Sequence, residues 1–203
     1  MEHNNFDQEY YVMSMDGANN HPLLAWGKTR FSPFLKAREV NISEYDLPLN
    51  IIFDEPYPIK YEMADLLMLA TLFAVSKNFK ELFEKMNIYG VQFVPVDIKS
   101  NQGTLITGHH VLHIWNKLEA IDKNNYIGGE LDMFNSIHDL KKFSLDKNLL
   151  NGMPLEKRLV FGLIEKKTII LVHQSVYDTI QSASLTGIKF FRVDEWDDNA
   201  IFR

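Results

Sequence analysis

Four apolar side chains at helical spacing mark the middle of the chain: Phe79, Leu82, Phe83 and Met86. Positions i, i+3, i+4 and i+7 share one face of a helix, so this pattern predicts an amphipathic helix. Ser76, three residues before Phe79, is a favourable N-cap. The helix should end before Gly90, because glycine adopts the positive φ of a helix-terminating loop at little cost.

Apolar segments flank this helix and favour strands. Residues 91–94 follow its glycine turn, and residues 71–75 precede the helix. The apolar run 66–75 alone could be a buried helix, but its β-branched counterpart at residues 168–172 favours a strand at residues 71–75. The same order recurs near the C-terminus, where residues 168–172 and 188–191 read as strands on either side of a second helix. Ser175 and Asp178 at the start of that helix resemble a capping box.

The two segments align as a weak internal repeat. Residues 75–97 and 172–194 share five identical positions at an offset of 97: Val75/Val172, Gly90/Gly187, Phe93/Phe190, Val96/Val193 and Asp97/Asp194. The shared apolar pattern favours two strand–helix–strand units, at about residues 71–97 and 168–194. If both strands of a unit join one sheet, they run parallel with a right-handed crossover.

The remaining patterns predict an α+β fold with a mixed sheet that carries both pseudo-repeated units in one body. Further strands are expected at residues 10–15, 47–53, 109–115 and 159–164, and a short helix at residues 61–69. No stretch rich in Gly, Ser or Pro reads as a linker. We therefore expect a single domain over residues 1–203.

Composition excludes several classes of protein. Hydrophobic residues make up 46% of the chain and charged residues 24%, which is globular composition. The absence of cysteine excludes disulfides, thiolate zinc sites and cysteine nucleophiles. The first residues do not resemble a signal peptide, and the longest apolar run, residues 66–75, is too short to span a bilayer. We expect a cytoplasmic protein that does not enter membranes.

The net charge of −6 argues against nucleic acid as a partner, since a basic face supplies most of that affinity. An acidic surface attracts basic partners, although it also serves solubility alone. The oligomeric state stays open.

Chemistry-bearing motifs are sparse. His109 and His113 lie in a predicted strand, about 13 Å apart, too far to share one ion. No nucleophile elbow, phosphate-binding loop or dinucleotide fingerprint occurs. We therefore predict no catalytic residues, no metal site and no cofactor, and a protein that is not an enzyme.

Two acidic-aromatic segments are candidate partner-binding sites. The first is the tail segment: Asp194, Glu195, Trp196, Asp197 and Asp198. The second, weaker candidate is Asp54, Glu55 and Tyr57. An aromatic anchor among carboxylates suits docking onto a basic surface. The alternative is that Trp196 caps the core while the acids are solvated.

These motifs resemble a bacterial family of immunity proteins from polymorphic toxin systems, immunity family eleven. The resemblance lies in residues 75–82, 88–96, 110–116, 169–176 and 185–190. It covers roughly residues 45–194 and brings no catalytic residue set. The proline-rich first 60 residues and the acidic tail are less like the family pattern.

The resemblance implies an immunity protein that neutralises one cognate toxin by tight stoichiometric binding, which occludes the toxin's active or substrate site. The acidic net charge of the chain suits a toxin with a basic surface. A small-ligand-binding or adaptor domain is the alternative, and a hydrolase, including one that reverses a toxin's modification, is a third.

Overall fold

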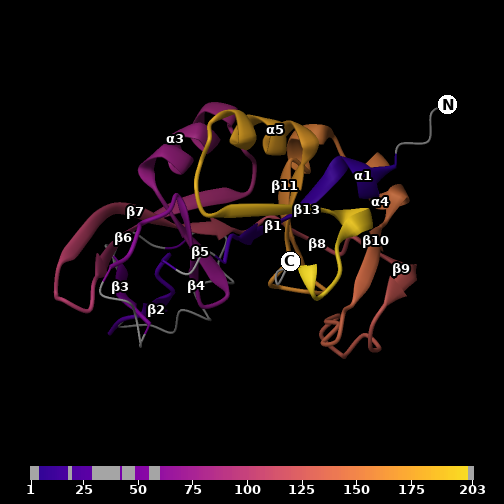
Figure 1. Cartoon of the computed structure of the whole chain (residues 1–203). Helices are drawn as coiled ribbons and strands as arrows, with labels where there is room; N and C mark the ends of the chain where they lie inside the picture. Colours follow the sequence, from indigo (N-terminus) through magenta and orange to yellow (C-terminus); the bar gives the residue numbers. More distant parts are fainter. Residues whose placement is uncertain (1–4, 18–19, 29–41, 43–48, 55–59, 201–203) are drawn as a thin grey trace.

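The computed structural model describes residues 5–17, 20–28, 42, 49–54 and 60–200 of the chain. Figure 1 shows a closed barrel at one end of the molecule, a five-stranded sheet beside it, and a two-stranded ribbon at the other end. The α+β class with mixed sheets, expected from the sequence, is confirmed.

The barrel has the strand order β2-β3-β6-β7-β5-β4. Its strands are β2 (Leu24–Trp26), β3 (Leu49–Phe53), β4 (Leu66–Leu69), β5 (Leu72–Val75), β6 (Val91–Lys99) and β7 (Leu105–Ile114). Alternate residues of β3 are buried, which places Leu49, Ile51 and Phe53 in an apolar cluster to which all six strands contribute. The barrel interior is therefore filled by side chains.

The five-stranded sheet has the order β13-β1-β12-β11-β8. Its strands are β1 (Tyr10–Met15), β8 (Lys117–Leu118), β11 (Val160–Leu163), β12 (Ile170–His173) and β13 (Ile188–Arg192). β1 occupies the residues predicted for it, and it pairs antiparallel with both β12 and β13. A strand near the N-terminus thus lies between two strands near the C-terminus.

Both strand–helix–strand units are present, and they lie in different sheets. Helix α3 (Lys77–Met86) joins β5 to β6 in the barrel, and α5 (Gln174–Ser182) joins β12 to β13 in the five-stranded sheet. In each unit a third strand, β7 or β1, lies between the two and runs antiparallel to both. The two strands of each unit are consequently parallel but not adjacent.

The two helices lie on the same side of the molecule (Figure 1) and share one apolar cluster between the sheets. Phe79 and Phe83 of α3 and Val176 and Ile180 of α5 are buried in it. This cluster joins the barrel to the five-stranded sheet. Within the described ranges, no helix is both long and apolar enough to cross a lipid bilayer.

The predicted cap of α3 is confirmed, and that of α5 is wrong. The Ser76 hydroxyl accepts a hydrogen bond from the Phe79 backbone N–H. In α5 the cap is instead His173, whose ring accepts from the Ser175 N–H, while Ser175 lies inside the helix. A histidine ring nitrogen can accept the capping hydrogen bond in place of a serine oxygen. The prediction from the sequence did not consider a histidine cap.

The short helix expected at residues 61–69 is wrong. Residues 66–69 form β4, which pairs with β5 in a hairpin whose turn contains Ala70 at a φ of 50°. Leu66 faces the cluster between the sheets, while Leu67 and Leu69 face the barrel interior. Because the segment is buried on both faces, nearly all of its residues are apolar. The alternation of apolar and polar residues that marks a strand is therefore missing from the sequence.

Asp65 fastens the barrel to the five-stranded sheet. Its carboxylate accepts hydrogen bonds from the Ser76 hydroxyl and from the backbone N–H and hydroxyl of Thr186. Burial alone favours the protonated carboxyl, but these hydrogen bonds outweigh it and hold the pKa of Asp65 below its usual value. Next to Thr186, Gly187 accepts from the Asp16 N–H at 2.9 Å.

We expect Asp65→Asn to lower the free energy of unfolding at pH 7 by about 1–2 kcal/mol, because an amide cannot accept all three hydrogen bonds. A lowered carboxyl pKa stabilises the fold above the unfolded pKa, and that contribution disappears as pH falls through the folded pKa. The difference between variant and wild type should therefore shrink at acidic pH. Urea denaturation at pH 7 and pH 3 measures it, with the exposed Asp139→Asn as control. An equal loss at both pH values would contradict the assignment.

The ribbon completes the fold. It consists of β9 (Ile121–Ile127) and β10 (Lys142–Leu145), followed by α4 (Lys147–Asn151) and the 3-10 turn η2 (Leu155–Lys157). The N-terminal turn α1 (Phe6–Glu9) and the 3-10 turn η3 (Val193–Glu195) pack beside it. Phe143 and Leu145 of β10 join an apolar cluster with Phe6 and Phe161. This packing brings both ends of the described chain to the ribbon.

Candidate functional site

The aromatic residue of the tail segment is part of the core. Trp196 is only 7% exposed, and its ring meets that of Phe143 edge-on at a centroid distance of 5.2 Å. Beside it, Arg192 donates to Asp194 at 2.6 Å and to Glu195 at 2.8 Å. These two exposed carboxylates therefore already have a cationic partner within the chain.

The end of the tail segment is fastened to the ribbon. The Asp198 N–H donates to the Lys141 carbonyl at 3.2 Å, and the Asp197 carboxylate accepts from the Asn199 N–H at 3.0 Å. Asp198 is exposed, whereas Asp197 is half-buried. The arrangement matches the alternative in which Trp196 caps the core, and it leaves Asp194, Glu195 and Asp198 as the surface of the segment.

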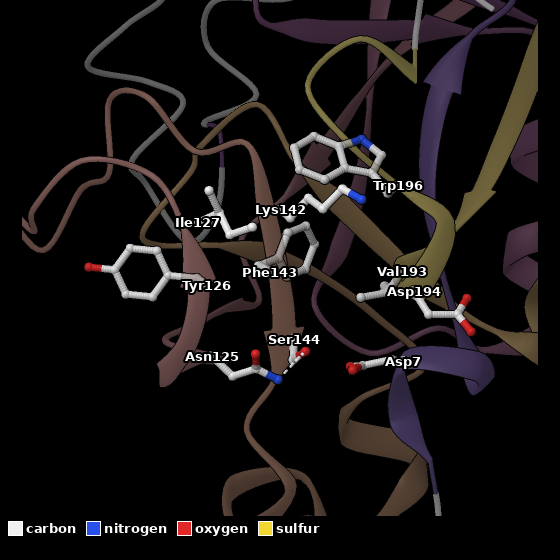
Figure 2. A pocket seen from close by; sticks show the side chains of 10 residues that line it. All are labelled: Asp7, Asn125, Tyr126, Ile127, Lys142, Phe143, Ser144, Val193, Asp194 and Trp196. Carbon is white, nitrogen blue, oxygen red and sulfur yellow. Dashed lines mark hydrogen bonds between the residues drawn. The ribbon is translucent and has the colours of Figure 1, made fainter.

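A shallow hollow of about 220 Å³ lies between the tail segment and the ribbon. Figure 2 shows the residues that line it: Asp7, Asn125, Tyr126, Ile127, Lys142, Phe143, Ser144, Val193, Asp194 and Trp196. The carboxylates of Asp7 and Asp194 lie on one side of it, near α1 and η3 (Figure 2). The Lys142 side chain extends toward Trp196 (Figure 2). Residues of α1, of both ribbon strands and of the tail segment thus build one surface of mixed polar and apolar side chains.

The polar groups of this hollow are held by hydrogen bonds of the fold itself. The Asp7 carboxylate accepts from the Leu145 N–H at 2.8 Å. The Asn125 amide donates to the Ser144 hydroxyl at 2.7 Å across the ribbon. The lining contains no histidine to activate that hydroxyl. An open, mixed-charge hollow of this kind suits recognition of a partner surface better than enclosure of a substrate.

The second acidic-aromatic candidate lies elsewhere. Asp54 is exposed at the end of β3 and lines another hollow, of about 330 Å³, together with Lys99. Glu55 and Tyr57 lie outside the described residues. Because β3 belongs to the barrel and η3 lies beside the ribbon, the fold does not bring Asp54 and the tail segment together (Figure 1).

The histidines of β7 lie on a strand, as predicted. His113 is buried, and the Nδ1 atoms of His109 and His110 are buried without a hydrogen-bond partner among the described residues. Burial lowers the pKa of both His109 and His110, which favours their neutral forms. In the part of the chain that the structure describes, no group of three or more His, Asp or Glu side chains gathers at ion-binding range.

One trio resembles a catalytic arrangement. The His173 Nδ1 lies 2.9 Å from the Ser175 hydroxyl, and its Nε2 lies 3.9 Å from the Glu9 carboxylate. However, the same Nδ1 accepts the Ser175 backbone N–H as the cap of α5. The Glu9 distance also exceeds that of a hydrogen bond. These contacts therefore serve the helix terminus.

A buried glutamate under the ribbon escaped the sequence reasoning. Glu165 is 2% exposed; its Oε1 accepts from the Ile121 N–H at 3.0 Å, and its carbonyl accepts from the Ile137 N–H at 2.7 Å. Within the described chain its Oε2 has no hydrogen-bond partner. Burial raises the pKa of Glu165. Through these two hydrogen bonds, Glu165 holds the first residue of β9 and also Ile137 in the loop that follows β9.

That loop, residues 128–141, carries the most exposed large apolar side chains among the residues that the structure describes. Met133 is 90% exposed and Phe134 is 72% exposed, and Ile127 at the end of β9 is also exposed. The signal available in the sequence was an adjacent Met-Phe pair in a polar stretch after Gly128. Periodicity cannot show whether such a pair is buried.

Comparison with known proteins identifies the family. No curated protein matches the chain. The Immunity protein family (Imm11) matches residues 12–195, which is nearly the whole chain and extends from within β1 to the end of η3. The match starts well before residue 45, so the proline-rich N-terminal region is part of the family pattern. It also includes both strand–helix–strand units and the ribbon, and on this evidence the chain belongs to the Immunity protein family (Imm11).

Proposed function

We propose that this chain is a cytoplasmic immunity protein that neutralises a cognate toxin by tight stoichiometric binding, covering the toxin's active or substrate site. The observation that carries the proposal is the family match over residues 12–195. Family membership supports an immunity role and implies a cognate toxin as partner. The open hollow beside the ribbon, with its mixed polar and apolar lining, supports a binding surface there.

The proposed role sets physical demands on the complex. Few toxin molecules can be left free, so the dissociation constant should be nanomolar or lower, a binding free energy of at least about 12 kcal/mol. The interface should bury roughly 1,600 Å² or more. With a net charge of −6, the chain would attract a basic toxin surface, which speeds association at low salt.

The first experiment is affinity capture of the tagged chain from its native cells, with identification of retained proteins by mass spectrometry. We expect a partner whose C-terminal domain arrests growth when expressed alone. Co-expression of the chain should restore growth, and the purified pair should form a 1:1 complex. A retained partner that is harmless when expressed alone would overturn the proposal.

Varying the dose separates binding from an enzymatic antidote. A stoichiometric inhibitor protects cells only when its amount equals or exceeds that of the toxin. A hydrolase that reverses the toxin's modification would protect at a small fraction of that amount, because it turns over. When the two expression levels are titrated against each other, growth should change from arrested to protected near one immunity protein per toxin molecule. Protection at a ratio far below one would favour the hydrolase.

A further inference from the structure

The loop of residues 128–141 ends in an apolar tip, which we define as Met133 and Phe134. Met133 is 90% exposed and Phe134 is 72% exposed, so most of the surface of each residue is open to solvent. Adjacent large apolar side chains that contribute nothing to the core are a feature of binding surfaces. Phenylalanine and methionine are also enriched at protein interfaces.

The tip is held in one conformation by Asp132. Its carboxylate accepts from the Phe134 N–H at 2.7 Å and from the Ser136 N–H at 2.8 Å. The Asp132 N–H in turn donates to the Ser136 carbonyl at 3.0 Å. Asn135 takes a φ of 56°, and its amide donates to the Glu119 carboxylate at 2.9 Å. The turn that carries the tip is thus held by hydrogen bonds within residues 132–136 and by one to Glu119 outside the loop.

The base of the loop is anchored in the core. Ile137 and Leu140 are buried in the apolar cluster beneath the ribbon. The Ile137 N–H donates to the Glu165 carbonyl, and the Lys166 ammonium donates to the His138 carbonyl at 2.8 Å. A partner that binds the tip therefore meets an ordered loop, and a preorganised loop loses less conformational entropy on binding.

The charge around the tip indicates what kind of partner fits. The loop of residues 128–141 contains three carboxylates, Glu130, Asp132 and Asp139, and one lysine, Lys141. Asp139 lies 3.8 Å from Lys141 and Asp132 lies 3.0 Å from the His138 ring, so Glu130 is the carboxylate of the loop that is open to a partner. Glu130 is exposed and has no ion-pair partner in the described chain. A complementary surface would offer an apolar pocket for the tip and basic side chains at its rim.

We infer that the apolar tip is the element of this chain that enters the cognate toxin, seating Phe134 and Met133 in an apolar pocket framed by lysine or arginine. This inference rests on the proposed function and adds to it the contact surface and the chemistry of the partner. The tip, rather than the tail segment, supplies the aromatic anchor, since Trp196 is buried.

The test uses the toxin domain retained by the wild-type chain, with its activity removed by substitution so that it can be purified. Phe134→Ala should weaken binding by at least about 30-fold, the loss typical of an anchor residue. Met133→Ala should weaken it less. Both melting temperatures should stay within about 2 °C of wild type, because the side chains are exposed. Leu105→Ala, which removes a 59% exposed apolar side chain of β7 away from the tip, is the control.

A charge reversal tests the rim. Glu130→Lys should slow association several-fold at low salt, and high salt should remove the difference. Glu156→Lys on η2 makes the same change in net charge away from the tip and should have a much smaller effect. Equal effects of the two variants would mean that only net charge matters.

The outcomes separate the two proposals. If the wild-type chain does not bind the toxin, the proposed function fails. If wild type binds and Phe134→Ala binds equally well, the tip inference alone is overturned. It is also overturned if Phe134→Ala instead converts a dimer of this chain to monomers at unchanged toxin affinity, as measured by sedimentation.

Discussion

Gly187→Ala is expected to lower the free energy of unfolding by roughly 3 kcal/mol, a large share of the stability of an ordinary domain. Gly187 has a φ of +75°, and a Cβ there would lie 2.5 Å from the Ala64 Cβ and 2.6 Å from the Leu66 carbonyl oxygen. Neither atom belongs to a flexible side chain. The added methyl group must therefore separate β4 from the turn that leads into β13.

The position also carries hydrogen bonds that this shift would break. Gly187 accepts from the Asp16 N–H, and Thr186 accepts from the Leu66 N–H. Urea denaturation measures the loss, and Gly103→Ala is a matched control, because Gly103 has a φ of +81° but open space around it. Gly103→Ala should show only the cost of the dihedral angle. Equal losses for the two variants would contradict the steric account.

Lys117→Met should have a comparable effect of opposite sign. Lys117 lies in β8 at the edge of the five-stranded sheet, and a Cβ on Gly162 would lie 2.4 Å from its Nζ. Burial lowers the pKa of Lys117 to about 8, and no carboxylate in the described chain pairs with it. Removing this partly buried charge should stabilise the fold at pH 7 by about 1–3 kcal/mol.

The pH dependence has a definite sign. An unfolded lysine keeps its proton up to about pH 10.4, whereas folded Lys117 releases it near pH 8. Between these values the unfolded state binds more protons, so wild-type stability rises with pH. The advantage of Lys117→Met should be largest below pH 8 and shrink toward pH 10. The exposed Lys147→Met is the control, and a constant advantage at all pH values would contradict this explanation.

Gly187→Ala also serves as a control for the functional tests. Gly187→Ala should lose protection against the toxin because less of the protein is folded. Phe134→Ala should lose protection while the protein stays folded. Comparing growth protection with the folded fraction therefore separates a lost contact from a lost structure.

Much of the secondary structure follows from local pattern. The apolar positions of residues 79–86 and the Ser76 cap determine α3, because a helix is closed by hydrogen bonds between near neighbours. β1 was likewise predicted from its own residues, whereas β5 was predicted from its β-branched counterpart at residues 168–172. The helix expected at residues 61–69 failed, because burial of β4 on two faces removes the alternation that distinguishes a strand.

The candidate sites were less accessible to such reasoning. An aromatic residue among carboxylates has the same sequence whether its ring is buried or exposed. Trp196 is buried because Phe143, more than 50 residues earlier, packs on its ring. Phe134 is exposed because Asp132 and the anchored base of its loop direct it away from the core. Both outcomes depend on contacts between distant residues.

The sequence by itself determined the α+β class, the two strand–helix–strand units as separate segments, and the family resemblance, since all three depend on short-range patterns. The tertiary structure alone decided that the units lie in different sheets, that β1 separates β12 from β13, and that the ribbon meets the tail segment. Strand partners are chosen by side-chain packing between residues up to about 180 positions apart, and no local periodicity encodes that choice.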